Sequence, residues 1–322
     1  MSNGRGGTTV EGQKILITGT AGQIALPMTR HFAQNNEVWG LARFSQPGSK
    51  EQVEEAGATP HKADLASGEL NGLPDDFDYV IHMAAFMAAS PDYDFALTQN
   101  AEATGLLMAH CRNAKGFLHA STAAAYKNNT DHTYVYAEGD PLGDSEQPYS
   151  ETYGVTKMAA EAVARTMCRL YDLPTVIGRI NVAYGQNGGL PAILLAMMTN
   201  GMPVPLKDSE PNMFSPVHEK DMCAHAEAFL EGATVPATIV NWGGDENVSI
   251  EDMCRRMGAQ VGVEPDFQYF PVGTHSRAYD SAKRISMTGE CTMSWQDGID
   301  DMVAAWDPEQ GARMIARLMG EG

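Results

Sequence analysis

Tyr153 and Lys157 are the residues whose types and spacing most suggest acid–base chemistry. They lie four positions apart at the head of an apolar-periodic run, Met158 to Leu170, so on a helix they share one face. A free phenol, with a pKa of about 10, exchanges protons poorly at neutral pH. A neighbouring ammonium favours the phenolate and lowers that pKa. The pair could pass a proton to or from a carbonyl or hydroxyl oxygen while hydride moves elsewhere.

Proton transfer by this pair would matter only if a bound nucleotide cofactor moves the hydride. The N-terminal region has the pattern of a nucleotide-binding unit. Lys14 to Thr18 reads as a short buried strand, followed by a glycine turn and a helical run to Phe32. Gly19 permits a sharp turn, and Gly22 lets the backbone approach a pyrophosphate. Free N–H groups at the start of the helix would face the phosphates. This order predicts a dinucleotide fold.

The end of the second predicted strand, residues 37–43, indicates which nicotinamide cofactor is bound. An acid at this position binds the ribose 2′-hydroxyl of NAD. Here the position is Ala42, and Arg43 follows it. A guanidinium without a carboxylate suits a 2′-phosphate, so NADP(H) is favoured and NAD is the alternative. Arg43 as a plain solvated loop cation is the competing interpretation.

Two further strands are predicted whose carboxyl ends lie on the same side of the sheet as the cofactor. Residues 61–65 contain Asp64, which could accept from an adenine amino group or cap the next turn. Residues 79–85 run into Ala84 and Ala85, whose small side chains allow a close pass over the cofactor ribose. His82, within that strand, is interpreted as a structural histidine.

Polar residues then follow that could serve the active centre. Asn100 is predicted either to brace the backbone there or to be an ordinary residue at the start of a helix. Residues 117–122 form a predicted strand that ends in Ser121 and Thr122. Either hydroxyl could hydrogen-bond a substrate oxygen beside Tyr153.

Together these residues resemble the extended short-chain dehydrogenase/reductase family, the branch of NAD-dependent epimerases and dehydratases. The resemblance covers nearly the whole chain. It rests on TGTAGQIA at 18–25, ADL at 63–65, HMAA at 82–85, Asn100, STAAAY at 121–126, YGVTK at 153–157, RINVAYG at 179–185, FSPVHEKD at 214–221 and IVNWGG at 239–244.

The resemblance implies an α/β fold, a Rossmann-type doubly wound parallel sheet with a smaller C-terminal substrate-binding domain. Residues 1–12 are expected to be a disordered lead and 13–180 the Rossmann domain, to which segments near 214–244 return. Residues 181–322 mainly form the substrate domain. A homodimer through two long helices, near 97–112 and 151–170, is also implied.

The resemblance further assigns roles to residues. Tyr153 is the proton-transferring residue, Lys157 lowers its pKa and Thr122 is the catalytic hydroxyl, with Ser121 as second choice. Asn181 and Met213 join Ser121 as expected substrate contacts. The expected cofactor contacts are Gly19, Ala21, Gly22, Gln23, Ile24, Arg43, Asp64, Leu65, Ala84, Ala85, Asn100, Tyr153, Lys157, Ile180 and Val182.

Departures from the family pattern narrow the chemistry. Dehydratases carry an Asp-Glu pair directly after the catalytic threonine, where this chain has Ala123 and Ala124, so sugar dehydration is not expected. Nucleotide-sugar enzymes usually hold the diphosphate with an arginine where this chain has Asn212-Met213. Nearby methionines indicate either an apolar pocket or ordinary core. Arg277 and Lys283 are candidate contacts for an anionic substrate, or surface charges.

Composition bounds the remaining choices. The net charge of −19 argues against a nucleic-acid partner, and no apolar run reaches the roughly 18 residues of a membrane span. The five scattered cysteines favour a reducing, cytoplasmic location, and no metal site is predicted.

Three functions follow, all with a small-molecule partner. An oxidoreductase acting on a carbonyl or secondary alcohol is favoured. A nucleotide-sugar epimerase with transient oxidation is the alternative, and a non-catalytic cofactor-binding regulator is a third.

Overall fold

A seven-stranded parallel sheet organises the chain, here described from a computed structural model for residues 10–143 and 150–318. The strand order is β13-β7-β5-β4-β1-β2-β3. The order reverses direction between β1 and β4, which places a ligand crevice outside the carboxyl ends of the strands. The predicted doubly wound α/β fold is therefore confirmed. The strands are β1 (Lys14–Thr18), β2 (Glu37–Ala42), β3 (Thr59–Lys62), β4 (Tyr79–His82), β5 (Gly116–Thr122), β7 (Thr175–Ile180) and β13 (Thr238–Trp242).

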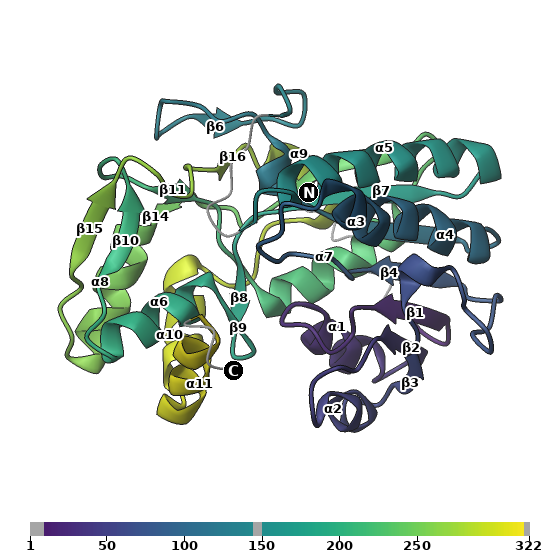
Figure 1. Cartoon of the computed structure of the whole chain (residues 1–322), viewed down its shortest axis with the longest axis horizontal. Helices are drawn as coiled ribbons and strands as arrows, with labels where there is room; N and C mark the ends of the chain where they lie inside the picture. The colour runs from purple at the N-terminus through teal and green to yellow at the C-terminus, as the bar shows by residue number, and fades with distance from the viewer. Residues whose placement is uncertain (1–9, 144–149, 319–322) are drawn as a thin grey trace, which may run out of the picture.

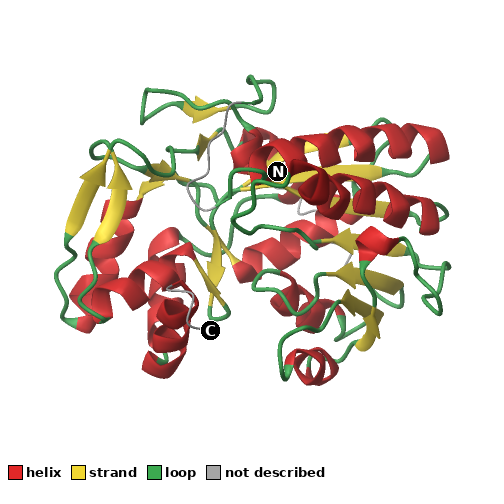
Figure 2. Ribbon diagram, in the orientation of Figure 1, coloured by secondary structure: helices red, strands yellow, loops and turns green. Residues whose placement is uncertain are grey.

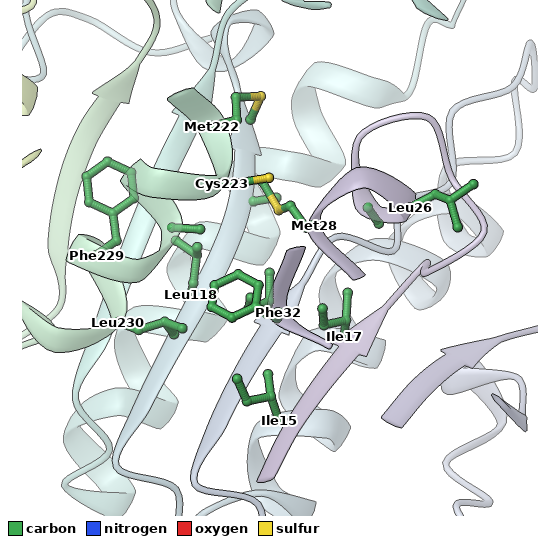
Figure 3. Packing of buried hydrophobic residues seen from close by; sticks show 14 of the residues in the cluster. Ile15, Ile17, Leu26, Met28, Phe32, Leu118, Met222, Cys223, Phe229 and Leu230 are labelled. Carbon is green, nitrogen blue, oxygen red and sulfur yellow. The ribbon is translucent and has the colours of Figure 1, made fainter. Parts of the chain in front are cut away.

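Helices cover both faces of this sheet, as Figures 1 and 2 show. One face packs against α1 (Ala25–Phe32), α2 (Ser49–Glu55), α7 (Glu219–Glu231) and α9 (Ala282–Thr288). The other packs against α3 (Tyr93–Leu97), α4 (Ala103–His110) and α5 (Tyr153–Tyr171), with a π-helical segment, Thr98–Glu102, between α3 and α4. Because both faces are covered, the central strands β1, β4, β5 and β7 are buried along nearly their whole length, whereas the edge strand β3 is partly exposed. Figure 3 shows the first of these cores, in which Ile15 and Ile17 of β1, Phe32 of α1, Leu118 of β5 and Phe229 of α7 belong to one buried cluster.

A second group of elements has its own core beside the sheet (Figure 1). Its helices are α6 (Leu190–Thr199), α8 (Ile250–Val261), α10 (Trp295–Ala304) and α11 (Pro308–Leu318). Short strands border it or join it to the sheet: β6 (Val135–Tyr136), β8 (Ala183–Gly185), β9 (Gly188–Gly189), β10 (Val204–Lys207), β11 (Met213–Phe214), β12 (Val217–His218), β14 (Val248–Ser249), β15 (Phe267–Phe270) and β16 (Ala278–Tyr279). None of the described helices combines the length and apolar character that a membrane crossing requires.

The structure corrects several expected boundaries. Val10 is 6% exposed and belongs to the first core, and the Gly12 N–H donates to Asn35 O at 2.8 Å. Residues 10–12 of the expected lead are therefore folded, and residues 1–9 lie outside the described chain. β3 ends at Lys62, before Asp64, and β4 ends at His82, before the alanines.

Candidate active site

The glycine turn after β1 has the geometry that a dinucleotide requires. Gly19 has a φ of +66°, and a Cβ there would lie 2.8 Å from Ala84 Cα, so this position needs glycine. The Gly22 N–H donates to Gly19 O at 2.7 Å, which closes the turn, and α1 begins at Ala25. Ile24 is the N-cap of that helix. The residues present therefore fit a pyrophosphate at the start of α1.

Two cavities adjoin this turn. A cavity of about 660 Å³ is lined on one side by Ala21 and Gln23, and on another by Arg313 and Met314 of α11. The sequence pattern did not point to α11 as part of this region. Its amphipathic pattern is that of any packed surface helix, so only the tertiary arrangement brings it there.

The smaller cavity, of about 70 Å³, collects residues expected at the adenosine end of the cofactor. It is lined by Gly19, Ala42, Arg43, Asp64, Leu65, Ala84 and Ala85, among others. The Asp64 carboxylate accepts from the Ala66 N–H at 3.1 Å as a helix cap, so the capping alternative for Asp64 is confirmed. Arg43 is exposed.

Tyr153 and Thr122 meet at the carboxyl edge of the sheet. Tyr153 is the first residue of α5 and Thr122 the last of β5. The Thr122 hydroxyl also accepts from the Ala124 N–H at 3.1 Å, which fixes its side chain. Burial raises the pKa of Tyr153 above its ordinary value, and a hydrogen bond with Thr122 opposes that rise. A phenol in this state holds its proton at neutral pH.

Lys157 lies one helical turn after Tyr153 and is 2% exposed. Its Nζ donates to Ala120 O at 2.6 Å. Burial lowers the pKa of Lys157 to about 8, while the nearby Glu161 carboxylate raises it. The expected lowering of the Tyr153 pKa by Lys157 is not seen, because the Lys157 ammonium donates to a backbone carbonyl of β5 and burial raises the Tyr153 pKa.

Asn100 braces the backbone beside this centre, as one of its two interpretations predicted. Its Oδ1 accepts from the Phe86 N–H at 2.7 Å, and its Nδ2 donates to Phe86 O at 3.0 Å and to Thr156 Oγ1 at 2.9 Å. The segment after Ala84 and Ala85 is thereby tied to α5. Asn100 lies in the interior of a helix that begins at Tyr93, and does not open one.

His82 is a hydrogen-bonded structural histidine, as predicted. Its ring nitrogens contact Thr18 Oγ1 at 2.7 Å and Thr104 Oγ1 at 3.0 Å. Burial lowers the pKa of His82 to about 3, so the ring is neutral and takes no proton at working pH.

Ser121 points away from the phenol. Side chains alternate along a strand, so Ser121 and Thr122 face opposite sides of the sheet. The Ser121 Oγ donates to Glu161 Oε1 at 2.5 Å and is 3% exposed. Glu161 in turn pairs with Arg179. The expected substrate contact at Ser121 is thus replaced by a buried polar network.

The remaining expected contacts lie where β7 leaves the sheet. Ile180 and Val182 are buried at that crossing. The Asn181 side chain is fully engaged by the backbone: Nδ2 donates to Arg277 O at 2.6 Å and Oδ1 accepts from Ser215 N–H at 3.0 Å. Met213 lies on β11, partly buried, with its N–H donating to Ser276 Oγ at 3.0 Å. Asn181 therefore connects the end of β7 to the backbone near β11 and β16 by hydrogen bonds.

Arg277 is a buried structural residue, which corrects its interpretation as a surface charge, whereas Lys283 is exposed, as its interpretation as a surface charge predicted. Arg277 is 3% exposed and donates to Ala123 O at 3.2 Å and to Asn128 Oδ1 at 2.5 Å. Lys283 Nζ donates to Ile239 O at 2.6 Å. The sequence did not reveal this because a surface cation and a buried one look alike without the tertiary contacts.

Comparisons with known proteins agree with this architecture. A family model described as the NAD dependent epimerase/dehydratase family matches residues 15–243. A trifunctional UDP-glucose 4,6-dehydratase/UDP-4-keto-6-deoxy-D-glucose 3,5-epimerase/UDP-4-keto-L-rhamnose-reductase of Arabidopsis thaliana is 24% identical over 91% of this chain, which spans only 47% of that protein. A low-salt glycan biosynthesis protein of Haloferax volcanii is 25% identical, over 90% of this chain and 97% of that one.

Among solved structures, a UDP-glucuronic acid 4-epimerase from Bacillus cereus, in complex with UDP-glucuronic acid and NAD, superposes with a TM-score of 0.78. The two chains are 22% identical, and the match covers 92% of this chain and 99% of the other. At that identity the likeness is one of fold.

Proposed function

Because the chain belongs to the NAD dependent epimerase/dehydratase family, we propose that it transfers hydride between a nicotinamide cofactor and a carbon that alternates between carbonyl and secondary alcohol. The observation that carries this proposal is the contact of Tyr153 with Thr122 at the sheet edge that also bears the glycine turn, with the buried Lys157 one helical turn further along α5. When bound, the cofactor would take up or supply the hydride.

The residues then divide the proton chemistry among them. In the reductive direction, the Tyr153 phenol would give its proton to the carbonyl oxygen as the carbon gains hydride, which leaves a phenolate. In the oxidative direction, that phenolate would take the proton back from the substrate hydroxyl as the carbon loses hydride. The Thr122 hydroxyl holds the same oxygen in place. The Lys157 ammonium stabilises the negative charge that develops on the phenolate.

Cofactor choice rests on the end of β2. Ala42 offers no carboxylate to a ribose 2′-hydroxyl, and Arg43 lines the cavity at the expected adenosine end. We therefore propose NADP(H) as the preferred cofactor, with NAD as the alternative. Titrating the protein with NADPH and NADH tests this. Arg43→Ala should weaken NADPH binding about tenfold and leave NADH nearly unchanged. Equal affinities in the unaltered chain would contradict the preference.

A sugar-nucleotide epimerase is the second candidate, and the similar proteins favour it. The Arabidopsis thaliana relative and the Bacillus cereus structure act on UDP-sugars by their names. Epimerisation would use the same residues with no net change in the cofactor. Against it, Asn212, near the position where a diphosphate-binding arginine is expected, donates through Nδ2 to Glu251 Oε1 at 2.9 Å within the second core.

Dehydration of a sugar is disfavoured for a chemical reason. Removing water from the substrate needs an acid and a base beside the catalytic hydroxyl, and Ala123 and Ala124 carry neither. A purely regulatory, cofactor-binding role is disfavoured too, since the three groups needed for proton transfer are all present. A cytoplasmic location, drawn from the scattered cysteines, remains part of the proposal.

One experiment separates the two enzymatic candidates. Mass spectrometry of small molecules that co-purify with the protein identifies a retained cofactor or sugar nucleotide. The protein is then incubated with NADPH and a panel of carbonyl compounds, and separately with UDP-sugars. Net loss of NADPH absorbance supports the oxidoreductase. Interconversion of sugar epimers with constant absorbance supports the epimerase, and neither change would count against both.

A further inference from the structure

A buried carboxylate, that of Glu161, lies one helical turn after Lys157 on α5. Glu161 is on the same helix face as Lys157, and its side chain is 4% exposed. It receives hydrogen bonds from Ser121 Oγ at 2.5 Å, Arg179 Nε at 2.9 Å and Arg179 Nη2 at 2.8 Å. Such a bidentate contact with a guanidinium fixes the orientation of the carboxylate.

The two donors come from neighbouring strands whose ends carry the site. Ser121 of β5 and Arg179 of β7 are direct partners in the parallel ladder. The residue before Ser121 is Ala120, whose carbonyl accepts from Lys157. Glu161 therefore anchors α5 to the strand that provides both the carbonyl for Lys157 and the hydroxyl of Thr122.

The other ionisable groups around Lys157 provide no negative charge at neutral pH. His82 of β4 and His119 of β5 are fully buried, and burial together with the Lys157 charge lowers the pKa of each. Tyr153 on α5 keeps its proton because burial raises its pKa. Arg179 of β7 is a cation already paired with Glu161. Glu161 is the neighbouring charge that favours an ammonium at Lys157.

We propose that Glu161 is a positioning residue for the reaction: its charge, held by Arg179 and Ser121, keeps the buried Lys157 side chain an ammonium at neutral pH. The proposal rests on the proposed function for its significance, since the positive charge of an ammonium would stabilise a Tyr153 phenolate and a neutral amine carries no such charge. Without the carboxylate, burial alone would act on Lys157 and favour the neutral amine.

The test measures Lys157 itself and needs no substrate. The full chain is labelled with ¹³C at lysine Cε, and the Lys157 signal is assigned by its absence in Lys157→Arg. Its midpoint of titration is expected near pH 8. In Glu161→Gln, which keeps the size of the side chain and loses its charge, the midpoint should fall by about one pH unit, a tenfold change in the ratio of ammonium to amine.

Three further variants separate charge from packing. Glu161→Asp retains the charge and should restore most of the midpoint. Asp245→Asn removes a carboxylate from another buried arginine, Arg284, away from Lys157. It should lower thermal stability and leave the Lys157 midpoint unchanged. If Glu161→Gln does not fold, the double variant Glu161→Leu/Arg179→Met replaces the buried ion pair by apolar side chains, a change that proteins tolerate.

Burial lowers the Lys157 pKa and Glu161 raises it. The double variant lacks Glu161, so the Lys157 titration midpoint should fall in it too. An unchanged midpoint in a folded Glu161→Gln or double variant would overturn the proposal and leave Glu161 a purely structural residue. Because the titration is read without turnover, this result stands whether or not a carbonyl substrate is found, and failure of the proposed function would appear only in the turnover assays.

Discussion

At the scale of single residues, the chemistry depends on the Tyr153 oxygen. Tyr153→Phe removes the oxygen and keeps the ring, so folding should be preserved. A positioned acid–base group is worth about 10²–10⁴-fold in rate, and we expect a loss of that size in turnover. Tyr93→Phe is the matched control, because Tyr93 is 45% exposed on α3, and its rate should be unchanged. Full activity in Tyr153→Phe would remove Tyr153 from the mechanism.

Lys157 should show a conflict between activity and stability. Burial lowers its folded-state pKa from 10.5 to about 8, so between these values the unfolded chain binds more protons than the folded one. This group therefore costs stability below pH 8, and the cost disappears as the pH rises toward 10.5. The ammonium, and with it catalysis, is lost over the same range.

Lys157→Met isolates this effect, since it abolishes the titration while filling a similar volume. Relative to the unaltered protein, its free energy of unfolding should decline by roughly 3 kcal/mol between pH 7 and pH 10.5. Urea unfolding at a series of pH values measures the difference. A difference that does not vary with pH would mean that Lys157 titrates normally in the folded chain. The variant should also be inactive at every pH.

At the scale of elements, Arg277 joins the segment after β5 to β16. Its guanidinium contacts Ala123 O, Asn128 Oδ1 and, at 3.3 Å, the Tyr136 hydroxyl, and its Cζ lies 5.2 Å from the centre of the Tyr136 ring. Lysine cannot reproduce a planar fork of donors. Arg277→Lys should therefore lower the free energy of unfolding by about 1–3 kcal/mol.

Hydrogen exchange locates the effect of this substitution. Amides in residues 123–136 should exchange faster in Arg277→Lys, because the segment loses its anchor. Arg255→Lys is the control: Arg255 pairs with Glu210 at the surface, where both side chains are nearly half exposed, and such pairs contribute about 0–1 kcal/mol. Equal effects of the two substitutions would show that Arg277 is not a structural anchor.

The elements also show what a sequence can predict. The limits of β1 follow from its apolar pattern and the glycine after it, because local steric rules act there. The helix expected near 151–170 is α5, which begins at Tyr153. The limits of β3 and of the helix around Asn100 were predicted less well. The short strand β3 has little periodicity, and helix ends depend on caps such as Asp92, which accepts from the Phe95 N–H.

Contacts between distant residues were predicted least well. Nothing local distinguishes Ser121, which faces Glu161, from Thr122, which faces Tyr153, except the alternation of a strand whose register is fixed by its neighbours. Glu161 could have been found, since it follows Lys157 by one helical turn. Its partner Arg179 lies on another strand, and pairing across the sheet cannot be read from spacing.

At the scale of the whole molecule, the exposed faces of α3, α4 and α5 indicate how two copies would associate. Phe95, Leu106 and Val155 are each more than 40% exposed on these helices, although all three are apolar. Clustered apolar side chains on a protein surface favour association. The homodimer expected through the two long helices stays a prediction, because no contact in a single chain tests it.

Leu106→Glu should therefore convert a dimer into a monomer, because a carboxylate buried in an apolar interface without a partner is strongly unfavourable. Light scattering after size-exclusion chromatography measures the mass directly, and the unaltered chain should elute at twice its monomer mass of 34.7 kDa. Val272→Glu is the control: Val272 is 71% exposed after β15, far along the chain from α4, and its mass should stay that of the dimer. A monomeric unaltered chain at micromolar concentration would contradict association through these helices, while the active centre, built within one chain, would be unaffected.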